Sequence, residues 1–246
     1  PEERFEGLSN WLSALSDTAG YNAERSWGSI QLIDRNADGR ADVCVLAPGD
    51  GLWCADSNGA DAFVRFRPAT SANPPTGPAS SSIFSGFADL DDWGTIHFPE
   101  MNDRGYLDVC GRGAMGIFCG IGVGPSPNRA SFATSTAGWA VLDAFTTGWD
   151  PREHWGTLSF GDVNGDGRDD VCGRGDDGIY CAIADTFDVG ATGIRYGFRA
   201  PVRWTGDFAP AAWDEPATWS SIRLLDVTRD GRADICARGA AWGAFC

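Results

Sequence analysis

One motif recurs four times along this chain, and it constrains the fold more than any other feature of the sequence. Each copy begins with a Trp, contains an acidic loop between two short apolar segments, and ends with a Cys. The copies span residues 27–54, 93–119, 155–181 and 219–246. Successive starts lie 66, 62 and 64 residues apart, so units of this length fill the sequence. A fixed period of this size is typical of repeat architectures, in which each unit packs on its neighbours.

Each unit contains the pattern of several short β-strands. In the third unit Leu158 and Phe160 alternate with smaller residues, and this period of two indicates a strand. The acidic loop follows, and then a second strand around Cys172 and a third that ends at Cys181. A fourth extended segment follows in the first three units, at 63–66, 130–133 and 195–198. Four antiparallel strands in each unit predict the blades of a β-propeller.

The two ends of the chain complement each other. The last unit stops at Cys246, directly after its third strand, and segment 3–7 at the N-terminus has the pattern of the missing fourth strand. Pairing these segments would close the ring and remove its exposed edges. We therefore predict a single all-β domain over residues 1–246. It is expected to be a four-bladed β-propeller with four-stranded antiparallel blades, closed by the N-terminal strand joining the last blade.

The eight cysteines fall into four pairs, one in each unit. The pairs are Cys44/Cys54, Cys110/Cys119, Cys172/Cys181 and Cys236/Cys246. Repeat symmetry favours a disulfide within each unit over the many other connectivities. Zinc is the competing interpretation, but the chain has no CxxC pair and only two histidines. Disulfides place the protein outside the reducing cytosol, so we expect it to be secreted.

The acidic loops have the spacing of a calcium site. Oxygen-bearing side chains at loop positions one, three, five and nine, with Gly at six and a carbonyl at seven, can wrap around a hard cation. Position twelve holds Val45, Gly173 or Ala237 in place of Glu, which excludes an EF-hand. The alternative is a metal-free turn rich in Asp and Asn. Three copies in register and a net charge of −15 favour calcium. The predicted ligands are Asp34, Asn36, Asp38, Arg40 (carbonyl) and Asp42; Asp162, Asn164, Asp166, Arg168 (carbonyl) and Asp170; and Asp226, Thr228, Asp230, Arg232 (carbonyl) and Asp234.

The loop of the second unit departs from this pattern. It offers Glu100, Asn102 and Asp108, but position five is Arg104. We expect the Arg104 side chain to enter the loop and replace the metal with an internal salt bridge. The chain is thus predicted to bind about three Ca²⁺ ions, with the second site empty.

The D-x-N-x-D-G-x-x-D loop between two strands, repeated at blade length, resembles the FG-GAP/VCBS repeat. That repeat occurs in integrin α-subunit propellers and in some fungal and bacterial propeller lectins. The resemblance covers essentially the whole chain as four units and implies a calcium-binding propeller. Integrin-like repeats usually number seven, and the Cys pair in every unit is an addition to the family motif. The family includes adhesion proteins, lectins and accessory modules of enzymes, so the resemblance says less about function.

Two further residue sets recur in register and are candidates for ligand binding. An aromatic residue lies six positions before each starting Trp, and Trp149-Asp150 and Trp213-Asp214 pair it with a carboxylate, as in many sugar sites. The alternative is that these rings are core residues between blades. Arg112, Arg174 and Arg238 each follow the first Cys of a pair by two residues. They either line a ligand groove or, as we favour, form salt bridges with the abundant carboxylates.

Composition narrows the functional classes. The charge of −15 argues against nucleic acid as a partner, and no apolar run is long enough to insert in a membrane. No G-x-S-x-G elbow, metalloprotease helix or phosphate loop is present, and His97 and His154 occupy positions that vary among the units. Catalysis is left open but not favoured. We expect a lectin-like, non-catalytic protein that binds a glycan or glycoprotein. The alternatives are an adhesive or accessory module of a larger protein, and a glycan-acting enzyme with its site on one propeller face.

Overall fold

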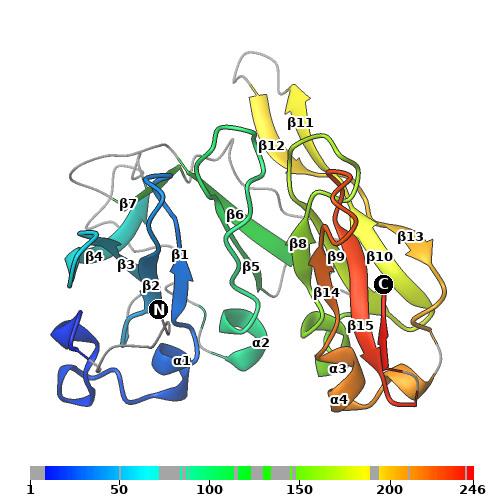
Figure 1. The fold of residues 1–246 in the computed structure, drawn as a ribbon, viewed down its shortest axis with the longest axis horizontal. Coiled ribbons are helices and arrows are strands. Elements are labelled where there is room, and N and C mark those ends of the chain that lie inside the picture. Colours follow the sequence, from blue (N-terminus) through cyan, green and yellow to red (C-terminus); the bar gives the residue numbers. More distant parts are fainter. Residues whose placement is uncertain are drawn as a thin grey trace, which may run out of the picture.

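The structure is a computed structural model. It describes residues 9–49, 51–71, 84, 87, 89–113, 116–122, 130–133, 145, 148–188, 194–209, 211–241 and 243–246. In this part of the chain the four units form four successive groups of strands, which run across the molecule from the N-terminal unit to the C-terminal one (Figure 1). Among these residues every strand pairing but one is antiparallel and the helices are single turns, so the fold is all-β. The described residues contain no helix that is both long and apolar enough to cross a membrane.

The first unit is a four-stranded antiparallel sheet in chain order. Its strands are β1 (Gln31–Ile33), β2 (Asp42–Leu46), β3 (Leu52–Ser57) and β4 (Phe63–Ser71). All five residues of β2 are buried, because neighbouring parts of the molecule cover both faces of the strand. Cys44 and Cys54 lie directly opposite each other in the β2–β3 pairing.

The second unit shares its sheet with the first. Its strands are β5 (Val109–Gly113), β6 (Gly116–Gly122) and β7 (Ala130–Ala133), and β7 pairs in parallel with β4. Where the sequence predicts a first strand around Ile96 and Phe98, only an isolated bridge between His97 and Cys110 forms.

The third unit corrects the prediction for its fourth strand. Its sheet contains β8 (Ser159–Gly161), β9 (Asp170–Gly175), β10 (Gly178–Ala182) and β13 (Val202–Thr205). Residues 195–198, expected as the fourth strand, instead belong to β12 (Ile194–Phe198), which forms a separate hairpin with β11 (Ala184–Asp188). Both segments have strand-like patterns, and the short-range hairpin pairing takes β12, which leaves the edge of β10 to β13.

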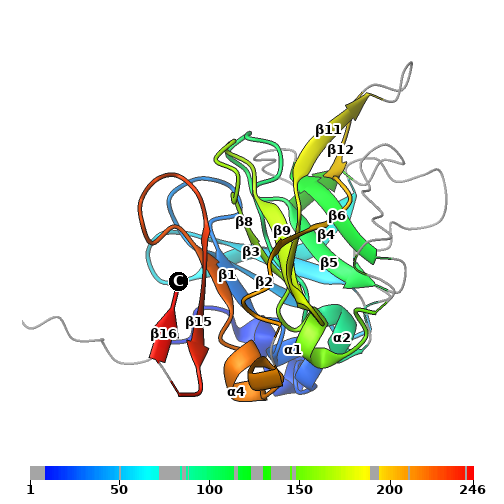
Figure 2. The same ribbon diagram turned by 90° about the vertical axis from the view of Figure 1, so that its right-hand side faces the viewer.

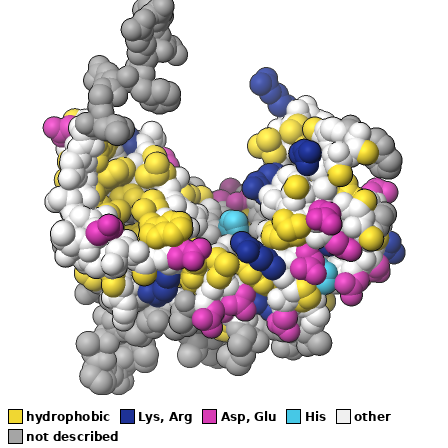
Figure 3. Space-filling model, turned by 90° about the horizontal axis from the view of Figure 1, so that it is seen from below, with side chains coloured by type: hydrophobic (Ala, Val, Ile, Leu, Met, Phe, Trp, Pro, Cys, Tyr) yellow, Lys and Arg dark blue, Asp and Glu magenta, His cyan; other side chains and the backbone are white. Residues whose placement is uncertain are grey.

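The fourth unit has three described strands, β14 (Arg223–Leu225), β15 (Asp234–Gly239) and β16 (Gly243–Phe245). Segment 3–7 lies outside the described residues, so closure of the ring stays a prediction. Among the described residues no strand pairing joins the first unit to the fourth. Seen from below, a hollow separates a left-hand lobe from a right-hand one (Figure 3), and the first unit lies on the left.

A single helical turn ends at each starting Trp. The turns are α1 (Glu24–Trp27), α2 (Leu90–Trp93), α3 (Arg152–Trp155) and α4 (Pro216–Trp219). Shorter 3₁₀ turns lie at Ser13–Leu15, Asp17–Ala19 and Ala211–Trp213. The turns α1 to α4 gather along one edge of the molecule, and the acidic loops lie at the opposite edge (Figures 1 and 2).

The units pack through a repeated contact between a Trp ring and a Gly. A Cβ atom added to Gly28 would lie 2.9 Å from the ring of Trp93, and one added to Gly156 would lie 2.8 Å from that of Trp219. At the middle junction, Gly94 faces Trp155 with more room, at 3.5 Å. The ring of each unit therefore rests on a residue that has no side chain in the unit before it. We call these contacts the first, second and third junctions.

Candidate metal and ligand sites at the junctions

The four disulfides join the pairs that the repeat symmetry predicts. They link Cys44 to Cys54, Cys110 to Cys119, Cys172 to Cys181 and Cys236 to Cys246. In the first three units the bridge joins two neighbouring strands at directly opposed residues. Each bridge staples the hairpin that follows the acidic loop.

The acidic loops of the first and third units share one arrangement. The Asp34 carboxylate accepts hydrogen bonds from the backbone N–H groups of Asp38 (3.0 Å) and Gly39 (2.8 Å). Asp162 accepts the matching bonds from Asp166 (3.1 Å) and Gly167 (2.7 Å). At position seven the Arg side chain pairs with the carboxylate at position five, in Arg40–Asp38 and in Arg168–Asp166. The loop therefore turns tightly around its first carboxylate.

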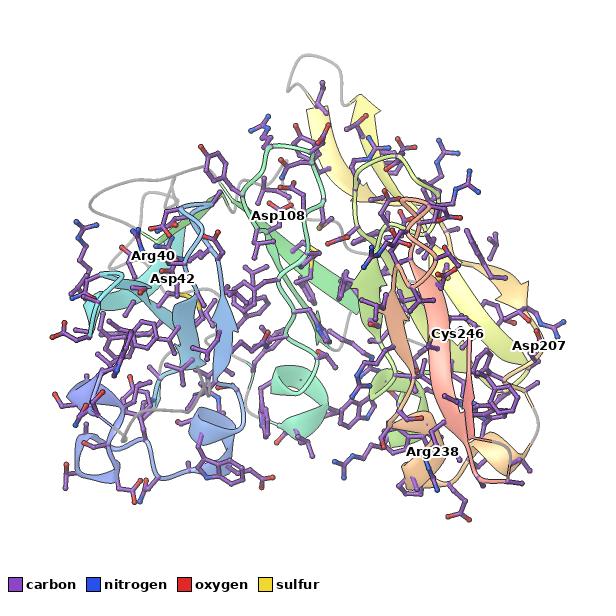
Figure 4. All side chains as sticks on the ribbon, in the orientation of Figure 1. Arg40, Asp42, Asp108, Asp207, Arg238 and Cys246 are labelled. Atoms are coloured by element: carbon purple, nitrogen blue, oxygen red, sulfur yellow. A yellow bond between two sulfur atoms is a disulfide. The ribbon has the colours of Figure 1, made fainter. Side chains whose placement is uncertain are left out.

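The Asp at position nine anchors each loop from inside. Asp42, Asp108 and Asp170 are fully buried, and each accepts a backbone N–H from the end of the third strand or just beyond it, at Ser57, Gly122 and Ala184. Burial raises the pKa of Asp108 to about 7 and that of Asp170 to about 6. Asp42 and Asp108 hold corresponding places in the first two units (Figure 4). These carboxylates tie the loop to the sheet.

The side-chain oxygens of the loops are of the kind that binds calcium, although here they accept hydrogen bonds from backbone N–H groups of the same loop. Asp and Asn oxygens are the ligands that Ca²⁺ prefers. In the first loop the Oδ2 atom of Asp42 is buried and has no hydrogen-bond partner, which leaves one oxygen for a cation. Within the described ranges, no three acidic, His or Cys side chains converge on one point. A bound ion would have to draw Asp38 away from Arg40.

The prediction for Arg104 was wrong in its mechanism. The Arg104 guanidinium does not enter the loop: it donates to the Tyr196 hydroxyl of β12 (2.9 Å) and lies 5.4 Å from the centre of that ring. Inside the loop, the Asn102 amide donates to both carboxylate oxygens of Asp108, at 2.8 Å each. The physical reason is that Tyr196 offers the exposed Arg104 both an acceptor and an aromatic face.

The recurring arginines join one unit to the next. Arg112 is buried; its Nε donates to the Phe145 carbonyl (3.0 Å) and its Nη2 to Asp150 (2.8 Å). Arg174 is buried in the same way, with Nε on the Phe208 carbonyl (2.8 Å) and Nη2 on Asp214. We call each of these arrangements an Arg latch. Asp150 and Asp214 therefore hold arginines, although their own side chains stay largely exposed, at 84% and 57%.

The rings of the predicted aromatic–carboxylate pairs lie in the core. Trp149 is 7% exposed and packs on Phe145, with 4.7 Å between ring centroids, and edge-on to Tyr180. Trp213 is half-buried against Phe208, at 4.7 Å. Trp149 therefore leaves no open indole face of the kind that a stacked sugar needs, and Trp213 exposes only part of its ring.

A different Trp borders an open pocket. Trp204 on β13 is 47% exposed and lines a cavity of about 170 Å³ between the third and fourth units. Ile179 and Cys181 form its wall on one side, and Leu224 and Ala233 on the other. The sequence contains a signal for this pocket: Leu224 and Ala233 stand where the second unit has the larger Phe98 and Leu107.

A second cavity lies among the innermost strands. Its volume is about 250 Å³, and His97, Ser159 and Arg223 are among the residues that line it. Burial, and then the charge of Arg223, lowers the pKa of His97 to about 4, so this imidazole is neutral at pH 7. The other histidine, His154, is buried, with Nδ1 2.8 Å from the Gly148 carbonyl.

Comparison with known proteins shows likeness at the level of the fold. No family model matches the sequence, and no curated protein matches it either. The chain is similar to a lectin of Agrocybe aegerita whose structure is described by its specific recognition of non-reducing terminal N-acetylglucosamine. The two chains are 22% identical, with a TM-score of 0.61 over 87% of this chain and 47% of the lectin. A Tc holotoxin pore of Photorhabdus luminescens is also similar, at 15% identity and a TM-score of 0.52, over 90% of this chain and 9% of the toxin.

These likenesses define the class of protein only as an all-β fold with repeated antiparallel sheets. The chain spans about half the length of the lectin that it matches and a small part of the toxin. What either protein does bears on this chain only as support for a proposal.

Proposed function

We propose that this protein is a secreted, calcium-stabilised lectin that binds glycans without catalysis. The half-exposed ring of Trp204 above an apolar pocket is the observation that carries the proposal. The fold likeness to an N-acetylglucosamine-binding lectin supports the same reading, and four disulfides suit an extracellular protein.

The pocket beside Trp204 suits a sugar that bears a small apolar substituent. An indole face packs on the C–H groups of a pyranose ring, and an enclosed apolar wall accepts a methyl group such as that of an acetamide. Polar groups lie at the same strand end: Thr205 also lines the pocket, and its hydroxyl donates to Asp207 at 2.6 Å. These groups would bind sugar hydroxyls. We therefore assign terminal N-acetylated hexoses as the preferred class.

The architecture that we propose is a β-propeller of FG-GAP/VCBS type. Four units in register, the junction contacts and the acidic loops support it. Calcium would be held by the loops of the first, third and fourth units, where the spacing of oxygens and the unpartnered Asp42 oxygen support binding. The second loop would stay empty because the Asn102 amide already supplies Asp108 with donors.

A glycan array with purified protein tests the proposal. We expect calcium-dependent binding to glycans with a terminal N-acetylhexosamine, and a loss of about fivefold or more in affinity for Trp204→Ala, since a stacked indole contributes about 1 kcal/mol or more. Trp11→Ala is the matched control, because Trp11 is also partly exposed but lies in the first unit, away from the pocket. A blank array from folded protein would refute the lectin assignment, and equal binding by Trp204→Ala would refute the site.

A further inference from the structure

The three junctions follow one packing rule. The starting Trp of the later unit is almost completely buried: Trp93, Trp155 and Trp219 are 8%, 7% and 8% exposed. At the second and third junctions an Arg latch adds a buried guanidinium that reaches a carbonyl and a carboxylate of the later unit. Each junction therefore has a leading face, which carries the Trp, and a trailing face, which carries the small residue and, at the second and third junctions, the Arg.

Within the part of the chain that the structure describes, the first unit presents a leading face that no other unit covers. Trp27 is 57% exposed, and Ile30 and Leu32 on the same face are 44% and 64% exposed. The corresponding Ile96 of the second unit is 3% exposed. Figure 3 shows hydrophobic side chains on the lobe to the left of the hollow, where the first unit lies.

The fourth unit presents an uncovered trailing face. Arg238 occupies the position of Arg112 and Arg174 but is exposed, and within the described residues its side chain has no hydrogen bond or ion pair. It lies at the lower end of the fourth unit, beside α4 (Figure 4). Ser220 occupies the position of Gly28, Gly94 and Gly156 and is exposed. Leu225 and Val227 nearby are exposed as well.

We propose that these two faces are the halves of one further junction, completed head-to-tail by a second copy of this chain. The Trp27 ring of one copy would rest on Ser220 of the other. The second junction shows that this is feasible, because a Cβ atom at Gly94 would lie 3.5 Å from Trp155, an ordinary contact. Arg238 would then meet Asn22, whose amide oxygen stands where Asp150 and Asp214 stand in the latches.

A second copy is the occupant that the two faces specify, since each chain carries both halves and the hollow separates them within one molecule. The contact would be heterologous, because a leading face meets a trailing face and not its own kind. Such contacts extend beyond a dimer unless the rotation closes a ring. The weight-average mass should therefore rise with concentration, and past that of two chains unless two copies close a ring.

Sedimentation velocity of the full chain over a hundredfold concentration range tests this proposal. Trp27→Arg blocks the leading face and Ser220→Arg blocks the trailing face. Each variant should be monomeric alone, because one of its two faces is blocked. Both substituted residues are exposed, so both variants should keep the wild-type melting temperature. An equimolar mixture of the two should form dimers and nothing larger, because each variant retains one intact face. Arg238→Ala should weaken association by several-fold without abolishing it.

Three outcomes would overturn the proposal. They are a wild-type chain that stays monomeric throughout, single variants that associate as strongly as the wild type, and a mixture of the two variants that does not pair. The second outcome would point to an isologous or unrelated surface. Trp204→Ala serves as the control, and it should associate like the wild type whether or not the sugar site exists, which keeps this test independent of the lectin assignment.

Discussion

One position on the innermost strand differs in every unit and bridges the junctions. Gln31 donates from its amide to the Ile96 carbonyl of the next unit at 2.6 Å, and in the second unit this position holds the buried His97. The same position holds Ser159 in the third unit and Arg223 in the fourth. In the sequence His97 looks like tolerated variation. In the structure it is a buried, neutral imidazole in the cavity shared with Ser159 and Arg223.

We predict that His97→Gln makes the protein less sensitive to acid. The pKa of His97 is about 4 in the folded protein and about 6.5 when unfolded, so the stability that it contributes is present above pH 6.5 and is lost as the pH falls toward 4. Between pH 7 and 5 the wild type should lose roughly 1–2 kcal/mol more than the variant, in which Gln keeps the donor as Gln31 does.

Urea unfolding of both proteins at several pH values measures this difference. Asp108 and Asp170, whose pKa values are raised, act in the opposite direction, because the stability that they contribute to the folded protein falls as the pH rises from about 4. They are common to both proteins, and the comparison removes them. Parallel pH profiles for the two proteins would contradict the role of His97.

The recurring arginines show how much of the side-chain contacts the sequence pattern could predict. Their spacing from the first Cys, together with the surplus of acid, already favoured salt bridges. The partners could not be read from the sequence, since Arg112 and Asp150 lie 38 residues apart and Arg174 and Asp214 lie 40 apart. The same latches explain why Asp150 and Asp214 accompany their tryptophans, a pairing that resembles a sugar site in the sequence.

At the scale of elements, the helical turn before each inner strand sets the spacing between units. Each turn ends on a Trp, and the next residue must leave room for the Trp of the following unit. Ser220, which follows the last Trp, shows that a Cβ atom is compatible with the turn itself. At Gly28 and Gly156 the Trp of the neighbouring unit therefore adds a requirement for Gly to the crowding by the preceding backbone carbonyl.

We predict that Gly156→Ala destabilises the protein by about 1–3 kcal/mol, as expected for overpacking in a core. The new Cβ would lie 2.8 Å from the Trp219 ring, which must shift. Gly94→Ala is the matched control, because its Cβ meets the preceding carbonyl at the same 2.6 Å but Trp155 only at 3.5 Å. Thermal unfolding should show the larger loss for Gly156→Ala. Equal losses would mean that the turn, and not the Trp contact, requires Gly.

Strand order within the third unit was only partly predictable. Alternation marks residues 195–198 as extended, and they are extended. The choice of partner depends on which edge is free in three dimensions, and the insertion of the β11–β12 hairpin leaves the edge of β10 to β13. Local pattern fixes the conformation of a short segment but not its partner.

At the scale of the whole molecule, calcium would hold the units in their folded arrangement. We predict that a chelator lowers the melting temperature and that titration calorimetry detects about three ions. Asp38→Ala should remove one ion, because it takes an oxygen from the first loop. Glu100→Gln in the second loop is the control and should leave the count unchanged. A count of four, or an unchanged melting temperature in chelator, would contradict the assignment.

The sequence by itself determined the repeat, the four disulfides and the β-rich units, because each of these depends on neighbours within one hairpin. The tertiary structure alone decided what happens between units: the burial of Trp149, the Arg latches, the outward turn of Arg104 and the open pocket at Trp204. Those outcomes depend on side chains that are tens of residues apart in the sequence and meet in the fold. A small difference in side-chain volume, such as Leu224 where the second unit has Phe98, decides whether a junction is filled. The repeat period and the residue spacing predict the structure of one unit, and the packing between units determines where its functional side chains lie.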